Sequence, residues 1–195
     1  YNETGGTFRP LREYGGIEYM FNAIPKKKIS YNTMSTNRKA GDQLKALNII
    51  STPADVALWN GTQWPASAPA NVQAAAANCD FFKYRGWGLN QLTGRTNYIA
   101  CLQPFVQQNI DTLTTAQFDA LLKNNVELAC KVFNKFLLQS SKAQQAVNDL
   151  IAGKFDTYGY LVAGGGAKNY VNNYYLPRVN ALVAALANAT IAPVV

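Results

Sequence analysis

Residues 84–98 have the sequence YRGWGLNQLTGRTNY, the most informative stretch of this 195-residue chain. Its glycines, Gly86, Gly88 and Gly94, allow tight turns and a close approach of a ligand to the backbone. The polar side chains of Gln91 and Thr93 lie between these glycines. The stretch therefore predicts a glycine-rich loop, and beyond residue 97 the apolar pattern becomes strongly helical.

Most of the remaining chain is predicted to be helical. Apolar residues recur at spacings of three and four from residue 115 to 137, with Thr115 as the predicted N-cap of one long helix. Residues 52–79 are rich in Pro, Ala, Asn and Trp, which predicts a long loop with one short helix inside it. The shorter predicted helices cover residues 11–21, 39–49, 71–77, 98–103, 141–151 (ended by Gly153) and 172–186 (after a turn at Gly164–Gly166). We expect a mainly α fold, one domain over residues 1–195, with long loops and at most a small β element.

Composition narrows the class of protein and of partner. Hydrophobic residues make up 48% and charged residues 15%, which is typical of a globular chain. No apolar stretch is long enough to predict a membrane span, and no signal peptide is visible. The net charge of +7, with one run of like charge at Lys26–Lys28, favours acidic cell-wall polymers or else only aids solubility. No nucleic-acid motif accompanies that charge.

The chain has no histidine and three widely spaced cysteines, Cys79, Cys101 and Cys130. These residues form no metal-binding pattern, so neither a metal nor a cofactor is predicted. The lack of histidine excludes Ser-His-Asp, Cys-His and His-zinc sites within the chain. Cys101 and Cys130 are predicted to be reduced core residues. Acid–base chemistry must then use carboxyl groups, and the only glutamates are Glu3, Glu13, Glu18 and Glu127.

Two segments together resemble glycoside hydrolase family 19, the chitinases and related phage endolysins of the lysozyme-like superfamily. Residues 2–8, NETGGTF, are similar to the family motif His-Glu-Ser/Thr-Gly-Gly-Phe. Residues 85–98 are similar to its second motif, Arg-Gly-Arg-Gly-Leu-Ile-Gln-Leu-Thr-Gly-Arg-Ala-Asn-Tyr. The resemblance covers about half of the chain and departs from the family at Trp87, at Asn90 and at Tyr1-Asn2. It implies a lysozyme-like catalytic domain.

The resemblance implies Glu3 as the general acid at the end of a helix. The two glycines that follow it supply the helix stop, and the helix dipole disfavours the ionised form of Glu3. Glu13 is the implied second carboxylate, kept ionised by its neighbour Arg12, with Glu18 and Asp80 as rivals. Thr93 would hold the attacking water or a sugar hydroxyl. The implied catalytic residues are Glu3, Glu13 and Thr93.

Further residues of the second motif are implied to bind the sugar, namely Gln91, Asn97, Tyr98, Trp87 and Arg85. For Asn97, Tyr98 and Arg85 a structural role is an equal alternative. Trp59 and Trp64 either stack on sugars or form a small local core.

These expectations amount to a peptidoglycan glycosidase of the phage endolysin or virion lysozyme type, acting with inversion. Inversion predicts carboxyl groups about 6.5–9.5 Å apart. A family 19 chitinase and a non-catalytic virion protein with a lysozyme-like fold are the alternatives, and transglycosylation in place of hydrolysis stays open. The expected partner is the peptidoglycan glycan strand, in the bacterial cytoplasm and then the periplasm or cell wall during lysis, or from the phage virion. Because the helix before Glu3 would lie upstream of Tyr1, the chain is also expected to be a C-terminal fragment or processed product. The N-terminal part of the same precursor, or other virion proteins, would then complete it.

Overall fold

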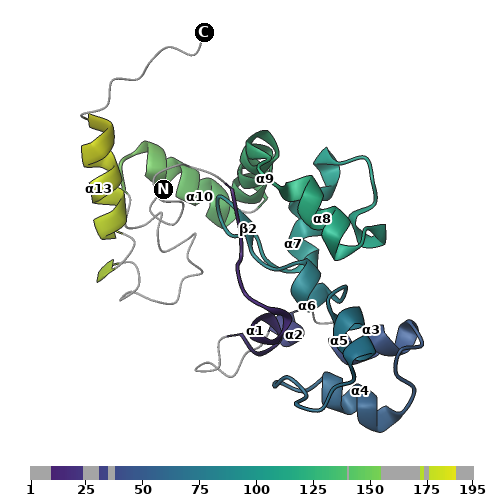
Figure 1. Cartoon of the computed structure of the whole chain (residues 1–195). Helices are drawn as coiled ribbons and strands as arrows, with labels where there is room; N and C mark the ends of the chain where they lie inside the picture. The colour runs from purple at the N-terminus through teal and green to yellow at the C-terminus, as the bar shows by residue number, and fades with distance from the viewer. Residues whose placement is uncertain are drawn as a thin grey trace. The chain divides into compact units, whose positions relative to one another are not determined.

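The computed structural model describes residues 10–23, 31–34, 38–139, 141–154, 172–173 and 176–187. The chain divides into two compact units, one of residues 9–133 and one of residues 1–8 with 134–195. The described residues are mainly helical and include one two-stranded sheet, which confirms the predicted mainly α class with a small β element (Figure 1). Glu3 and the predicted turn at Gly164–Gly166 lie outside the described residues.

The unit of residues 9–133 is built from short helices around α6 (Figure 1). Its helices are α1 (Ile17–Asn22), α2 (Tyr31–Met34), α3 (Ala40–Ala46), α4 (Pro53–Trp59), α5 (Ala70–Ala76), α6 (Asp80–Lys83), α7 (Arg95–Cys101), η3 (Gln103–Phe105), η4 (Ile110–Thr112), α8 (Thr115–Leu122) and the start of α9 (Val126–Leu138). Helix α6 contacts α1, α2 and α8, and α3 contacts both α4 and α5. The short α6 therefore links α1 and α2 to α8 within this unit.

The first hydrophobic core of this unit surrounds the ring of Phe21, which is fully buried. Trp59, Trp64 and Phe81 each meet that ring edge-on, with centroids 5.7, 5.3 and 5.2 Å away. Such edge-to-face pairs add to the free energy of burial. Of the two roles considered for Trp59 and Trp64, the structure favours the local core, because Trp59 is buried and Trp64 is partly buried against the same cluster.

A second buried cluster holds α6, α7 and α8 together. The rings of Tyr84, Tyr98 and Phe118 pack with centroids 5.3–5.4 Å apart, and all three residues are almost fully buried. Tyr84 lies at the C-terminal end of α6, directly before the glycine-rich loop, and Tyr98 lies in α7, after that loop. The cluster therefore fixes both ends of residues 84–98.

The sheet joins the start of the described chain to the glycine-rich loop. Strand β1 (Leu11–Arg12) pairs antiparallel with β2 (Trp87–Gly88), with Leu11 opposite Gly88 and Arg12 opposite Trp87. One further hydrogen bond, from the Glu13 amide to the Gly86 carbonyl at 2.8 Å, continues the pairing. The predicted helix over residues 11–21 is therefore wrong at its start, because residues 11–13 bond to β2 and α1 begins only at Ile17.

Other predicted elements differ in detail. The predicted helices over 39–49, 71–77 and 141–151 are confirmed as α3, α5 and α10 (Ser141–Ile151), and Gly153 after α10 has a φ of +73°. The predicted loop over 52–79 is wrong in part, because Thr52 caps a helix, α4, by accepting from the Asp55 amide. The predicted helix over 115–137 is two helices, α8 and α9, separated where Asn124 has a φ of +54°.

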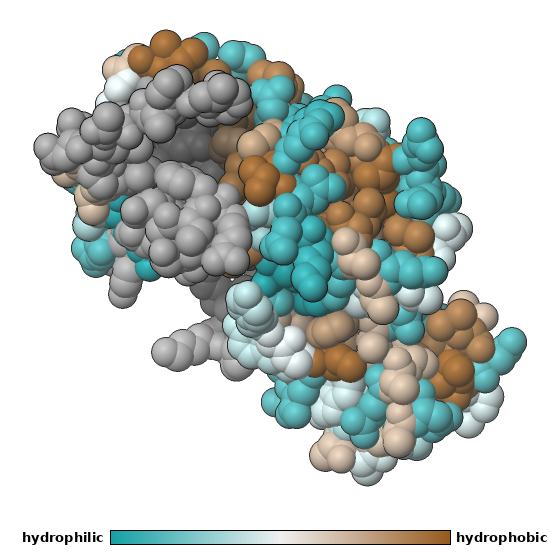
Figure 2. All heavy atoms as spheres, turned by 45° about the horizontal axis from the view of Figure 1, so that its top comes forward, coloured by the Kyte–Doolittle hydropathy of each residue, from teal (hydrophilic) through white to brown (hydrophobic). Residues whose placement is uncertain are grey.

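Two helices of the other unit are described besides the end of α9. They are α10 and α13 (Leu176–Ala187), the latter starting four residues later than predicted. On the face shown in Figure 2, hydrophobic residues form several groups separated by hydrophilic ones. None of the described helices combines the length and the apolar character that crossing a membrane would require.

Candidate active site

Three polar side chains converge on the backbone of Gly86. A Cβ placed on Gly86 would lie 2.9 Å from Oε2 of Glu13, 2.8 Å from Oε1 of Gln91 and 3.4 Å from Oγ1 of Thr93. Ordinary carbon contacts are about 3.5–4.0 Å, so glycine leaves the space that these oxygens need. The structure therefore brings together three of the residues that the sequence predicted for the site.

One of the two oxygens of the Glu13 carboxyl group accepts both of its hydrogen bonds. Its Oε2 accepts a hydrogen bond of 2.5 Å from the Tyr31 hydroxyl and one of 3.0 Å from the Gly86 amide. Within the described ranges no residue bonds to Oε1 of this half-buried group. In both contacts the carboxyl oxygen is the acceptor. One oxygen is thus fixed, and the other makes no hydrogen bond to a described residue.

Tyr31, at the start of α2, was not predicted for the site. Burial, followed by the hydrogen bond and charge of Glu13, raises the pKa of Tyr31 above its ordinary value. Its hydroxyl therefore stays protonated at neutral pH and remains a donor to Glu13. The residue is 18 positions from Glu13 in the sequence, and no local pattern links the two.

Backbone hydrogen bonds hold the loop that carries Gln91 and Thr93 in a closed turn. Trp87 and Leu92 exchange two hydrogen bonds, from the Trp87 amide at 3.1 Å and from the Leu92 amide at 2.7 Å. Between them Gly88 has a φ of +84° and Gln91 a φ of +51°, and Gly94 at +87° leads into α7. These values lie in the region that glycine adopts without strain. The predicted tight turns at Gly88 and Gly94 are confirmed.

The two loop side chains present hydrogen-bond acceptors to the site. The Thr93 hydroxyl donates to the Gln91 carbonyl at 2.8 Å, which orients its lone pairs away from that bond. The Gln91 amide nitrogen has long contacts of 3.4 Å with the carbonyls of Leu11 and Gly88, while its Oε1 lies near Gly86. These two side chains and the carboxyl group of Glu13 make the site rich in acceptors. It is therefore suited to bind the donors of a water molecule or of sugar hydroxyls.

Arg12 was expected to support the charge of Glu13, but its side chain bonds to other groups. Its guanidinium donates to Asp119 Oδ1 at 2.9 Å, to the Tyr98 hydroxyl at 2.9 Å and to the carbonyls of Arg85 and Lys83. Adjacent side chains in extended backbone point to opposite faces, so Arg12 and Glu13 diverge. The Glu13 carboxyl group bonds instead to the Tyr31 hydroxyl and the Gly86 amide.

The remaining predicted sugar-binding residues have structural contacts. Trp87 is 1% exposed, and Tyr98, fully buried, donates to the Arg85 carbonyl at 2.7 Å. The Arg85 guanidinium donates to Asp119 Oδ2 at 2.6 Å and to the Phe82 and Glu13 carbonyls. For Tyr98 and Arg85 these contacts favour the bracing role. Asn97 is exposed and donates to the Thr93 carbonyl at 2.8 Å, so it lies at the edge of the site.

The rivals to Glu13 lie in other surroundings. Glu18 is exposed on α1. Asp80 is 3% exposed; its Oδ1 accepts from Gln43 at 2.8 Å and its Oδ2 pairs with Arg38 at 3.3 Å. Burial raises the pKa of Asp80, against the lowering effects of Gln43 and Arg38. A pocket of about 480 Å³ adjoins this network, lined also by Lys83 and Asp111.

Asp111 ties that network together. It pairs with Arg95 and with Arg38, at 3.5 Å for the latter, and accepts from the Tyr84 hydroxyl at 2.6 Å. The bond to Arg95 is the main cause that lowers the pKa of Asp111 to about 2. Nearby, the buried ammonium of Lys83 donates to the carbonyls of Asp111 and Leu113, and burial lowers its pKa. Each of these charges has a named partner, which is typical of a structural ion-pair network.

The cysteines do not contribute to the site. Cys79, Cys101 and Cys130 are free thiols, and burial together with the charge of Asp80 raises the pKa of Cys79 to about 12. The expectation that Cys101 is a reduced core residue is confirmed, but Cys130 is exposed. The buried face of α9 runs through Leu128, Ala129 and Val132, and Cys130 lies off that face.

Comparison with known proteins leaves the family resemblance a prediction. No protein-family model, curated protein or solved structure matches this chain. Among the described residues, no group of three or more Cys, Asp or Glu side chains is arranged to hold a metal ion. The function therefore has to be argued from the groups around Gly86.

Proposed function

We propose that this chain is a glycosidase that cleaves the glycan strands of peptidoglycan. The observation that carries the proposal is the convergence of the Glu13 carboxylate, the Gln91 amide oxygen and the Thr93 hydroxyl on Gly86. The three residues come from two segments, and residues 85–98 form one of the two motifs on which the resemblance to family 19 rests. A lysozyme-like arrangement of the fold belongs to the same proposal.

In the proposed mechanism, Glu13 is the base that activates water. A carboxylate with one oxygen fixed by Tyr31 and Gly86 can accept a proton from water at its other oxygen. Thr93 would accept a hydrogen bond from that water or from a sugar hydroxyl. Glu3 would protonate the leaving oxygen, so that the bond is cut with inversion at the anomeric carbon.

The test is an activity assay of wild type and three variants on purified peptidoglycan and on chitin. Glu13→Gln keeps the size of the side chain and removes the base, so we expect it to lower kcat by about 10²–10⁴-fold. Glu3→Gln is expected to lower kcat comparably. Glu18→Gln is the matched control, because Glu18 is exposed on α1, and it is expected to retain full activity.

Each alternative has its own outcome. Faster cleavage of chitin than of peptidoglycan would identify a chitinase, and wild type that cuts neither substrate would overturn the enzyme proposal. Full activity of Glu13→Gln would remove Glu13 as the base, and full activity of Glu3→Gln would remove Glu3 as the acid. The anomeric form of the first product, followed by NMR, reports inversion directly. An anhydro product would show that the reaction is transglycosylation and not hydrolysis.

A further inference from the structure

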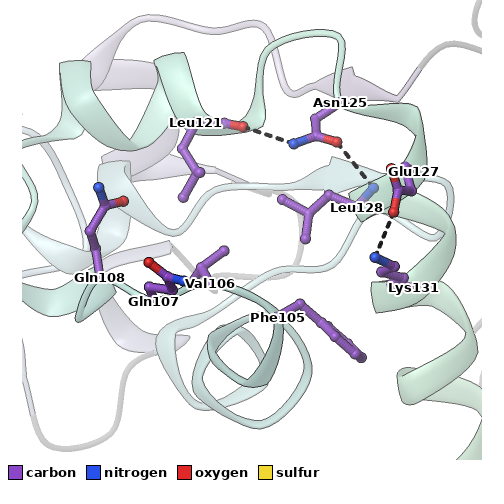
Figure 3. A pocket seen from close by; sticks show the side chains of 9 residues that line it. All are labelled: Phe105, Val106, Gln107, Gln108, Leu121, Asn125, Glu127, Leu128 and Lys131. Carbon is purple, nitrogen blue, oxygen red and sulfur yellow. Dashed lines mark hydrogen bonds and ion pairs between the residues drawn. The ribbon is translucent and has the colours of Figure 1, made fainter.

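A pocket of about 310 Å³ lies between the segment after η3 and the junction of α8 with α9 (Figure 3). Its volume is at the lower end of the ~300–1,000 Å³ that small-molecule sites occupy. One wall carries Phe105, Gln107 and Gln108, and the other carries Asn125 and the ion pair of Glu127 with Lys131. The side chains of Val106, Leu121 and Leu128 extend into the space between the walls (Figure 3).

Both walls are fixed by amide side chains. Gln103 closes the first segment: its Oε1 accepts from the Ile110 amide at 2.9 Å, and its nitrogen donates to the carbonyls of Val106 and Gln108. On the other wall, Asn125 Oδ1 accepts from the Leu128 amide at 3.1 Å at the start of α9. Because these bonds already hold the backbone, a ligand would find the walls preorganised.

The groups that face the pocket combine three kinds of contact. Phe105 lines the pocket and is 41% exposed, so part of an aromatic side chain is accessible there. The side-chain amides of Gln107 and Gln108 are exposed and make no hydrogen bonds within the part of the chain that the structure describes. Leu121 and Leu128 add apolar side chains to the lining. An aromatic face, free amides and a small apolar surface occur together here.

We propose that this pocket binds an acetamido sugar of a glycan, at a site separate from the groups around Gly86. The C–H face of a pyranose would pack on the ring of Phe105. The acetamido group would exchange hydrogen bonds with Gln107 or Gln108, and its methyl group would meet Leu121 and Leu128. The role of the site as a second hold on the glycan strand rests on the proposed function, whereas its ligand follows from the pocket alone.

The experiment measures retention on insoluble polysaccharide rather than cleavage. Glu13→Gln protein is incubated with chitin, whose sugars carry the acetamido group, and with cellulose, whose sugars lack it. We expect retention on chitin well above that on cellulose. In the same background, Phe105→Ala and the double variant Gln107→Ala/Gln108→Ala are each expected to weaken binding to chitin about five- to tenfold.

Three further variants control for folding and for general surface effects. Phe105→Tyr keeps the aromatic face and should bind like the parent protein. Leu58→Ala removes an exposed apolar side chain and Gln73→Ala an exposed amide, both far along the chain from this pocket, and neither should change retention. If Phe105→Ala fails to fold, the glutamine double variant decides.

The proposal is overturned if the parent protein binds cellulose as well as chitin, if it is retained on neither, or if both pocket variants bind like the parent. Selective binding of free stem peptides would assign the pocket to the peptide instead and would equally overturn it. Failure of the proposed function is separate, since it appears as wild-type protein that cleaves neither peptidoglycan nor chitin, whatever the retention.

Discussion

The Tyr31 hydroxyl donates a hydrogen bond of 2.5 Å to Oε2 of Glu13, and the Gly86 amide donates to the same oxygen. Tyr31 comes from α2 and Gly86 from the glycine-rich loop, so two separate segments orient one carboxyl group. Removing the Tyr31 hydroxyl leaves one of these two donors, the Gly86 amide, to orient the carboxyl group. Tyr31 is thus a positioning residue for the proposed base.

Tyr31→Phe removes that hydroxyl and keeps the ring. A hydrogen bond to a charged group contributes about 1.5–3 kcal/mol, so we expect kcat on peptidoglycan to fall roughly tenfold or more while KM changes little. Tyr19→Phe, which alters an exposed tyrosine on α1, is the control. A change confined to KM, or an equal loss in both variants, would contradict the positioning role.

Gly86→Ala tests the convergence of the site without removing any functional group. The added methyl would lie within 3.0 Å of oxygens of both Glu13 and Gln91, so these side chains must move apart. A displacement of about 1 Å in a catalytic group can lower the rate roughly 10²-fold. Gly16→Ala is the matched control, because nothing lies within 4 Å of a Cβ there. Steady-state kinetics and thermal melts of both variants provide the comparison, and equal activity would refute the close packing.

Of the three converging residues that the sequence predicted, Glu13 followed from the family resemblance, whereas Gln91 and Thr93 lie within one short stretch. Gln91 and Thr93 were found together because a loop of a few residues keeps its side chains close whatever the rest of the chain does. Tyr31 was missed because only the tertiary packing of α2 brings it to Glu13. Arg12 was linked to Glu13 because the two are neighbours in the sequence, whereas pairing with β2 makes Arg12 extended and turns it away from Glu13.

Fold predictions failed where tertiary context or one residue overrode the helical pattern. The apolar spacing from 115 to 137 continues across Asn124, but the positive φ of that residue ends one helix and redirects the next. Asparagine adopts this conformation more readily than most residues, so the pair Asn124–Asn125 was a usable signal. Helix α4 was missed although Thr52 and Pro53 form a regular helix start, a capping residue followed by proline at the first position.

Asn90 carries a buried amide without partners in the described part of the structure. Both its side-chain nitrogen and oxygen are buried and unbonded, at a position where family 19 has an apolar residue. Burying an unpaired amide costs about 1–3 kcal/mol, so Asn90→Leu is expected to raise the free energy of unfolding by at least 1 kcal/mol. Urea unfolding of the two proteins measures the difference. A variant no more stable than wild type would contradict this prediction.

Arg12 is expected to stabilise the elements that carry the site, by the hydrogen bonds that it donates to them. It joins β1 to Asp119 of α8, to Tyr98 of α7 and to two carbonyls around α6. Arg12→Ala removes the donor that joins these groups, although Asp119 keeps its bond from Arg85 and the Arg85 carbonyl keeps its bond from Tyr98. We expect a loss of about 2–3 kcal/mol and a fall in Tm of roughly 5–10 °C. Lys123→Ala, which removes an exposed positive charge between α8 and α9, serves as the control in thermal melts. Equal Tm values for the two variants would show that the contacts of Arg12 contribute little.

Asp111 makes the stability of the fold depend on acid pH. Its pKa, lowered to about 2 mainly by the bond to Arg95, lies below the value of about 3.9 that an aspartate has in an unfolded chain. The unfolded state therefore binds the proton first, and the stabilising contribution is present above about pH 4 and is lost as the pH falls toward 2. Asp80 acts in the opposite direction, because burial raises its pKa. The contribution of Asp111 is therefore best measured by comparing wild type with a variant at this one position.

Asp111→Asn is the variant that isolates it. The amide is close in size to the carboxyl group but does not titrate and cannot form the ion pairs with Arg95 and Arg38. We expect the variant to be less stable than wild type at pH 6, with the gap in unfolding free energy narrowing steadily between pH 4 and pH 2. Urea titrations at pH 6, 4, 3 and 2 measure this gap. A gap that stays constant over that range would mean that the Asp111 charge does not stabilise the folded state.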